Sequence, residues 1–157
     1  MNIFWLSFNP YLCAKWHNDK HVVKMILEYA QMLCTAHRLC SDNVDDIIYK
    51  KAFWNHPCAI WARETTGNYK YLYILFRQLC FEYTHRYNKI HTCEKKLIEP
   101  LNYIPEKIPE GNITTFPQAM FDDVKHKNPI IAYRQYYLKY KISFCKYTNR
   151  EKPYWLP

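Results

Sequence analysis

One polar stripe in this sequence holds side chains suited to acid–base or covalent chemistry. Its members recur at the spacing of an α-helix, and they are His17, Lys20, His21, Lys24, Glu28, Gln31 and Thr35. At about 100° per residue, these positions fall within roughly 60° of one line. Apolar residues cover the rest of the circumference, so we expect a buried helix whose polar line forms the wall of an active or binding site.

Lys24 and Glu28 lie one helical turn apart on this stripe and can form an ion pair. A carboxylate held beside an amine in a partly apolar pocket is also what general acid–base or imine chemistry requires. We therefore take Glu28 and Lys24 as candidate catalytic residues and expect Lys20 to face a phosphate. A partly exposed ion pair without a function is the alternative.

His17 and His21 place two imidazoles at positions i and i+4, which is the geometry of a zinc pair on a helix. In the metalloprotease motif a glutamate follows the first histidine, but Asn18 stands here. We therefore assign no metal and no cofactor, and keep a metal-dependent hydrolase only as an alternative. The two histidines are then hydrogen-bonding residues near a helix start, or contacts for phosphates when charged.

A second cluster of cationic, amide and aromatic residues lies between Asn55 and Leu72. His56 precedes Pro57 at a predicted helix start, where free backbone N–H groups favour anions. We expect this cluster to bind nucleic acid through His56, Trp61, Arg63, Asn68 and Lys70. Packing in the core is the alternative for its aromatic members.

In the C-terminal third, lysines and arginines alternate with tyrosines and tryptophans. This pattern is typical of a phosphate track with stacking platforms. The candidate contacts taken from it are Arg134, Arg150 and Trp155. A solvated helix face is the alternative.

Composition narrows the class of partner. The 157 residues carry a net charge of +8 and are 18% aromatic, which favours a polyanionic partner such as DNA. Only two glycines are present, so glycine-rich phosphate loops are excluded, and with them NTPases and dinucleotide enzymes. The seven scattered cysteines are typical of reduced thiols in an intracellular protein, and no segment is long and apolar enough for a membrane span. The sequence leaves open whether the protein has protein partners.

The signals for secondary structure are mostly helical, and we predict one all-α domain over residues 1–157. Asn9-Pro10 starts a short helix after an extended segment, and Asn18 or Asp19 caps the long helix that ends near Arg38. Further helices are predicted near residues 44–52, from Pro57 to about 87 with a bend or a division at Gly67, from Thr92 to before Pro100, and from Pro129 to about Lys146. A long loop with several prolines over residues 101–117 and an irregular basic, aromatic tail over residues 148–157 complete the chain.

Three strings carry a resemblance to known proteins: DKHVVKMILEYAQMLCTAHR from Asp19, NHPCAIWARETTGNYKYLY from Asn55 and AYRQYY from Ala132. They resemble an uncharacterised family of small phage and large-DNA-virus proteins. In the order of its features, the chain is also similar to the pyrimidine-dimer DNA glycosylases of the endonuclease V type, which are small, basic and all-α.

The second resemblance implies a DNA glycosylase and lyase that attacks the sugar C1′ with an amine while a glutamate assists. By role, Glu28 would be that carboxylate, and Lys20, His21, Lys24 and Arg38 would contact phosphates of double-stranded DNA. The attacking amine would be that of Met1, since the size of Asn2 disfavours removal of the methionine, or that of Lys24. A non-catalytic nucleic-acid-binding or virion-associated protein is the main alternative.

Overall fold

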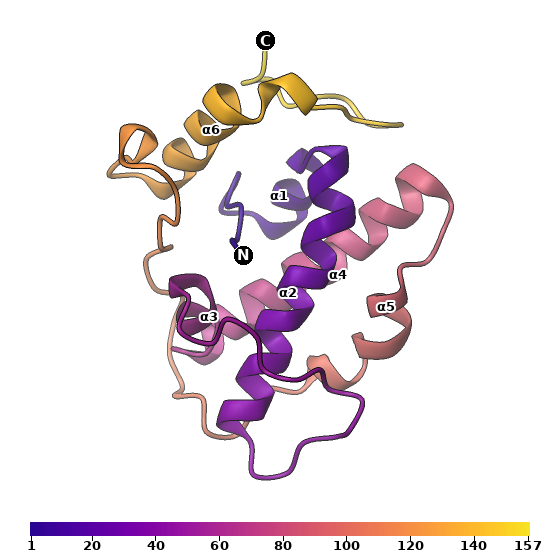
Figure 1. Cartoon of the computed structure of the whole chain (residues 1–157), viewed down its shortest axis with the longest axis vertical. Helices are drawn as coiled ribbons and strands as arrows, with labels where there is room; N and C mark the ends of the chain where they lie inside the picture. The colour runs from indigo at the N-terminus through magenta and orange to yellow at the C-terminus, as the bar shows by residue number, and fades with distance from the viewer.

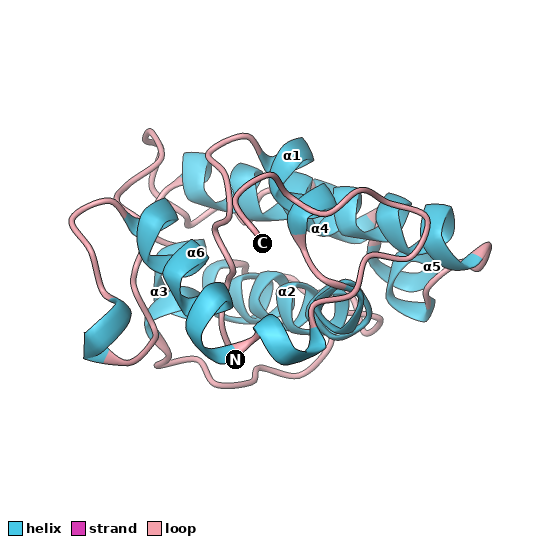
Figure 2. Cartoon of the chain, turned by 90° about the horizontal axis from the view of Figure 1, so that it is seen from above, coloured by secondary structure: helices cyan, strands magenta, loops and turns pink.

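A computed structural model describes all 157 residues, and it contains helices and loops without a β-strand (Figure 2). The all-α prediction is therefore confirmed. The α-helices are α1 (Pro10–Trp16), α2 (Asp19–Cys40), α3 (Pro57–Ala62), α4 (Thr66–Tyr87), α5 (Thr92–Leu97) and α6 (Pro129–Tyr140). Short 3₁₀ turns lie at Pro100–Asn102, Asp122–Val124 and Ile142–Phe144. None of the helices is long and apolar enough to cross a bilayer.

The two 22-residue helices, α2 and α4, pack against each other at the centre of the molecule (Figure 1). Helix α1 packs on α4, and α3 packs on α2. The first residues of the chain run between α2 and α6, where Phe4 stacks on His21 of α2 and meets the edge of Tyr133 of α6. The side chains of Ile3, Trp5 and Leu6 are fully buried. The N-terminal segment is thus part of the core, and this packing fixes the position of residues 3–6 between α2 and α6.

Local capping signals place the helix starts as predicted. The side chains of Asn9, Asn18 and His56 each accept a hydrogen bond from a backbone N–H in the first turn of α1, α2 and α3. Pro10 and Pro57 occupy the first helical position, where the missing N–H has no consequence. These three predictions are confirmed because a cap depends only on residues next to it in sequence.

The short helix predicted near residues 44–52 is wrong, since this segment is an irregular loop. Arg38 of α2 donates hydrogen bonds to the carbonyl groups of Ile48 and Tyr49. The hydroxyl of Thr35 donates to the Ala52 carbonyl at 3.3 Å and accepts from the Ala52 N–H at 3.0 Å. Side chains of α2 therefore satisfy backbone groups that a helix would have bonded internally.

Other boundaries differ from the prediction by a few residues. His91 caps α5 in place of Thr92, and α6 ends at Tyr140 rather than near Lys146. The predicted run from Pro57 is indeed divided, into α3 and α4, but the break lies at residues 63–65, so Gly67 itself is neither the bend nor the break. It lies in the first turn of α4, where a Cβ atom would come within 2.8 Å of the Gly111 carbonyl oxygen. Glycine is required there so that the proline-containing loop can approach α4.

Helix α2 is buried on most of its circumference, as predicted, but one edge faces solvent. Val23 and Leu27 on this edge are 44% and 42% exposed, where the sequence predicts burial. They lie beside the exposed Lys20 and Lys24. The polar stripe is therefore split between an interior part and a solvent-facing part.

Candidate active site

The carboxylate of Glu28 lies at the point where α2 meets the start of the chain. Its Oε2 atom is 3.8 Å from the α-amine of Met1 and accepts a hydrogen bond from the Asn2 N–H at 3.2 Å. The Nζ of Lys24, one turn earlier on α2, is 3.5 Å from Oε1. The Glu28 side chain is 13% exposed and that of Lys24 is 70% exposed. A mostly buried carboxylate therefore faces two different amines.

The backbone around Met1 is fixed by several hydrogen bonds. The Asn2 amide donates to the Ala119 carbonyl at 2.9 Å, and its oxygen accepts from the Tyr133 hydroxyl at 2.8 Å. The Phe4 N–H donates to the hydroxyl of Tyr29 at 3.0 Å. These contacts tie the segment to α2, to α6 and to the loop that precedes α6. The amine is thus held in one place before any substrate arrives.

A cleft of about 230 Å³ opens at this carboxylate. Its walls come from the N-terminal segment, α2, the loop at Ala119 and the C-terminal part of α6 with the residue after it. The lining residues are Met1, Asn2, Phe4, His21, Lys24, Met25, Glu28, Ala119, Tyr136 and Lys141. The Nζ of Lys141 lies 4.9 Å from the centre of the Tyr136 ring. The cleft thus combines a carboxylate, cations and a ring, which suits a nucleotide with its phosphates.

His56 stands beside the same cleft. Its Nδ1 accepts the Cys58 N–H at 3.1 Å, and the Cys58 thiol lies 3.6 Å from the side-chain oxygen of Asn2. Partial burial lowers the pKa of His56, the positive amine of Met1 lowers it further, and Glu28 opposes both effects. The predicted nucleic-acid contact at His56 therefore lies within electrostatic reach of the amine and the carboxylate.

His17 and His21 lie in the interior. His17 is fully buried, and its two ring nitrogens are bonded to the Cys13 carbonyl and the Tyr29 hydroxyl, both at 2.8 Å. Burial lowers the pKa of His17 to about 4. The Nδ1 of His21 is 2.5 Å from the Tyr137 hydroxyl, and burial also lowers the pKa of this imidazole. No group of three potential metal ligands converges on this pair.

This geometry assigns different roles to the two histidines. His17 has no exposed surface with which to contact DNA, and its nitrogens are already bonded to groups that hold the N-terminal segment. His21 borders the cleft through its ring, which is 6% exposed and stacks on Phe4 at 4.1 Å between ring centres. Both side chains support the N-terminal segment at Phe4, His17 through the Tyr29 hydroxyl and His21 through ring stacking.

The second predicted cluster is divided by the fold. Trp61 and Asn68 are buried, and Asn68 donates to the Trp61 carbonyl at 2.9 Å, so neither presents a surface to DNA. Arg63 is half-buried and donates to the Ala59 carbonyl at 2.8 Å. Lys70 is exposed on α4. The core alternative thus describes Trp61, while His56 alone interacts electrostatically with the amine and the carboxylate of the cleft.

The predicted C-terminal contacts mostly hold the tail in place. The guanidinium of Arg134 lies over three rings, those of Trp16, Tyr154 and Trp155, at 5.0–5.9 Å, and its Nε donates to the Leu6 carbonyl at 3.0 Å. Arg150 donates two hydrogen bonds to Glu82, at 2.6 and 3.1 Å. Neither arginine is free for a phosphate in this arrangement.

Two further cations that the sequence predicts as phosphate contacts, Lys20 and Arg38, lie near the two ends of α2. Lys20 is exposed, with its Nζ 4.5 Å from the centre of the Phe144 ring. Arg38 is occupied with the loop carbonyls described above. Sequence reasoning missed Asn2, Tyr136 and Lys141 as parts of the cleft, since no local spacing connects them to Glu28. The alternation of tyrosines and cations in α6 was the only available signal for the last two.

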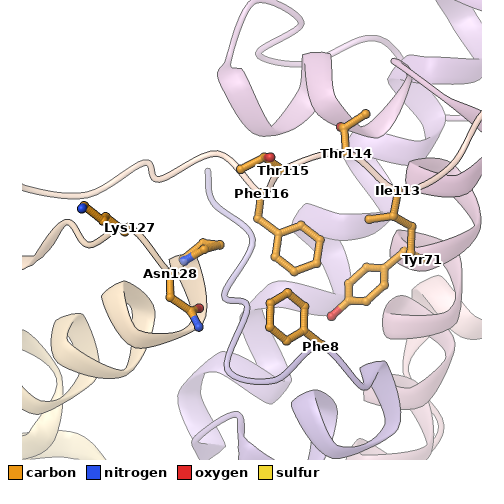
Figure 3. Close-up of a pocket in the computed structure, with 9 residues that line it drawn as sticks. Phe8, Tyr71, Ile113, Thr114, Thr115, Phe116, Lys127 and Asn128 are labelled. Carbon is orange, nitrogen blue, oxygen red and sulfur yellow. The ribbon is translucent and has the colours of Figure 1, made fainter.

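A second, larger cavity of about 640 Å³ lies elsewhere in the molecule (Figure 3). The rings of Phe8, Tyr71 and Phe116 form one side of it, and Lys127 stands at the opposite edge (Figure 3). The Tyr71 hydroxyl donates to the Ser7 carbonyl at 2.9 Å. Lys127 is the only charged residue among those that line this cavity. This cavity is larger than the cleft at Glu28, but only the cleft combines a carboxylate with amines, so we take the cleft as the candidate active site.

A comparison with known protein families finds one match to this chain. The family model described as "Pyrimidine dimer DNA glycosylase" matches residues 1–95. No curated protein and no solved structure matches the chain. The matched residues include the N-terminal segment, all of α2 and the capped start of α3. They therefore contain the amine, the carboxylate and the imidazole that meet at the cleft.

Proposed function

The chain belongs to the pyrimidine dimer DNA glycosylase family, and we propose from this premise that it excises dimers from double-stranded DNA with an amine nucleophile and Glu28. The observation that carries the proposal is the placement of the Met1 α-amine 3.8 Å from Glu28 Oε2, at the edge of a cleft. An amine and a carboxylate within reach of one reacting carbon are the two groups that imine chemistry needs.

The proposed reaction uses two groups of the protein, the nucleophilic amine and the Glu28 carboxylate. The amine lone pair forms a bond to the sugar C1′, and the bond from C1′ to the damaged base breaks with its electron pair going to the base, which takes up the proton that the attacking nitrogen loses. Glu28 accepts a proton from the amine and stabilises the positive charge that develops at C1′. Opening of the sugar ring, with a proton from Glu28 passing to O4′, then leaves a protonated imine between the protein and C1′. Strand cleavage follows when the Glu28 carboxylate removes a C2′ proton and the 3′ phosphate leaves with the C3′–O bonding pair.

We propose Met1 rather than Lys24 as the source of the amine. The side chain of Met1 is 2% exposed and its backbone neighbours are fixed, whereas the Lys24 side chain is 70% exposed. Nucleophilic lysines are activated by desolvation, which this position does not provide. We propose Lys24 and Lys141, which line the cleft, and the exposed Lys20 on α2 as contacts for phosphates instead.

We also propose that residues 1–157 act as one domain. Residues beyond the matched range complete the cleft, because Ala119 accepts the Asn2 hydrogen bond and Tyr136 and Lys141 form one wall. Further, Arg150 of the tail is bonded to Glu82 of α4. Removing the C-terminal third is therefore expected to open the site.

The test is a covalent trap. The purified protein is incubated with a duplex that carries one thymine dimer, borohydride is added, and the reduced protein–DNA adduct is digested and mapped by mass spectrometry. We expect an adduct at the α-amine of Met1 that requires the dimer. Undamaged duplex serves as the control for the dimer, and Lys24→Gln serves as the control for the alternative amine.

Each other outcome selects another function. An adduct at Lys24 that disappears in Lys24→Gln would move the nucleophile to that side chain. Salt-sensitive binding without adduct or cleavage would leave a non-catalytic DNA-binding protein. Hydrolysis that depends on added divalent metal would favour the metal-dependent alternative, although both nitrogens of His17 are already bonded within the protein.

A further inference from the structure

An exposed aromatic tip stands beside the cleft and has no role in the chemistry proposed above. Phe53 is 68% exposed and Trp54 is 46% exposed, and both lie in the loop that leads into α3. Phe53 has a backbone φ of 46°, in the left-handed region that bulky residues rarely adopt. The tip therefore combines two unfavourable features, an exposed ring and a strained backbone, in one residue.

The tip is held rigidly at both ends. On one side, Ala52 is bonded through both backbone groups to the Thr35 hydroxyl of α2. On the other side, the His56 N–H donates to the Phe53 carbonyl at 2.9 Å and closes a tight turn. Backbone strain persists only where the surroundings enforce it, and it concentrates at functional positions. The protein thus holds the Phe53 backbone in one conformation and leaves the ring exposed to solvent.

The loop that carries the tip is anchored on α2, on the same helix as Glu28. Thr35 lies seven residues after Glu28 on the same face of α2, which is about 10 Å along the helix axis. Successive bases along one strand are about 3.4 Å apart, so the anchor of the tip at Thr35 lies about three base steps from Glu28 along α2. Lys50 and Lys51 flank it, and the Lys51 Nζ lies 5.4 Å from the centre of the Trp54 ring. The charge of these lysines is complementary to that of the DNA backbone.

Glycosylases must unstack a nucleotide to reach its sugar, and DNA-bending proteins often do so by inserting an apolar side chain between bases. We propose that Phe53 is such a wedge and enters the base stack of the bound duplex about three steps from the dimer, with Trp54 and Lys51 supporting it. The inference rests on the proposed function, because it takes a dimer-containing duplex as the ligand. It adds a positioning residue outside the cleft, which would explain why a strained phenylalanine is retained there.

The variant that tests the wedge is Phe53→Asn. Asparagine adopts the left-handed backbone conformation more readily than phenylalanine, so the melting temperature is expected to stay the same or rise. Loss of a stacked ring is expected to weaken binding of the dimer duplex about tenfold. Opposite signs for stability and affinity distinguish a wedge from a residue that only supports the fold, and Phe53→Gly provides a second variant with a relaxed backbone.

Binding is measured in the Glu28→Gln background, so that the duplex stays intact, with 2-aminopurine placed one to five steps from the dimer. We expect fluorescence to rise at about the third step for the parent protein and to stay low for the Phe53→Asn variant. A two-base mismatch at that step should reduce the tenfold difference, because unstacking there is already easier. The matched control is Phe81→Asn, since Phe81 is 47% exposed beside Arg77 on α4, away from the cleft.

Failure of the wedge and failure of the proposed function give different results. If the protein with Phe53 intact traps on the dimer duplex but Phe53→Asn binds equally well and shows the same fluorescence, the wedge is wrong and the glycosylase stands. A fall in melting temperature that parallels the loss of affinity also overturns the wedge, because the ring would then be structural. If the protein with Glu28 and Phe53 intact forms no adduct and leaves the dimer duplex uncleaved, the proposed function fails first.

Discussion

Glu28 of α2 and Glu82 of α4 are both mostly buried carboxylates on the two central helices, yet their partners differ in kind. The Glu82 side chain is 6% exposed and is bonded by two arginines, at 3.2 Å by Arg86 and at 2.6 Å by Arg150. The Arg86 side chain is fully buried and also pairs with Asp19 at 2.9 Å. Glu28, 13% exposed, faces a chain-terminal amine and an exposed lysine at the edge of a cleft.

The difference in partners indicates a difference in task. A guanidinium keeps its proton at any accessible pH and holds a carboxylate through a fixed set of donors, so the Glu82 cluster can only be structural. An amine can lose its proton and attack an electrophile, so the Glu28 cluster can react. The protein thus uses one residue type in two ways, and the cation beside each carboxylate decides which.

The strongest way to break this comparison is Glu28→Gln. Loss of the proton acceptor and of the charge at the reacting carbon is expected to lower the single-turnover rate on a dimer duplex by about 10²–10⁴-fold. Affinity for the duplex should change little, because the amide keeps the shape and the phosphate contacts are elsewhere. Rates and binding are measured on one preparation whose melting curve matches that of the parent. A rate within threefold of the parent would remove Glu28 from the chemistry.

The converse substitution is Glu82→Gln. It leaves two buried or half-buried guanidinium groups with a weaker acceptor, and breaking a buried ion pair costs about 3 kcal/mol or more. For a chain of this size, such a loss lowers the melting temperature by roughly 6–12 °C. The trapping rate of the molecules that remain folded should be unchanged at 20 °C. A loss of rate at unchanged stability would show that the two carboxylates are not divided as described.

Much of the fold that positions the two carboxylates could be predicted from the sequence. The caps at Asn9, Asn18 and His56 depend on neighbouring residues, so helix starts were predictable, and the stripe on α2 pointed to Glu28. The loop over residues 44–52 was not predictable, because Arg38 and Thr35 bind its backbone from another element. The sequence of this segment gave no sign of those contacts.

The candidate site was predictable only in part, for a related reason. The approach of the Met1 amine to Glu28 joins residues 27 positions apart, and nothing in their spacing indicates it. The family resemblance suggested it instead. Arg134 and Arg150 were expected to reach DNA because a sequence shows charge but not whether rings or carboxylates already occupy that charge. The left-handed backbone of Phe53 is likewise held by the bonds between Ala52 and Thr35 and by the His56 N–H on the Phe53 carbonyl, not by phenylalanine itself.

The smallest effect concerns the two imidazoles, which repeat the contrast between interior and cleft. His17 is the interior member, and burial lowers its pKa to about 4, below the value of about 6.5 in an unfolded chain. As the pH falls below 6.5, the unfolded chain therefore binds a proton before the folded one does. The stabilisation from neutral His17 is complete above pH 6.5 and is lost progressively down to pH 4, by about 3 kcal/mol at most.

Urea unfolding at pH 7.5, 6.0, 5.0 and 4.5 measures this slope, and His17→Gln is expected to flatten it. Part of the slope will remain, because burial also lowers the pKa of His21 and of His37. His85→Gln, on the exposed side of α4, is the matched control and should keep the parent slope. If His17→Gln and His85→Gln lose stability in parallel between pH 6.5 and 4.5, His17 is not the buried neutral support of the N-terminal segment. The rigid placement of the Met1 amine would then depend on Asn2 and its partners alone.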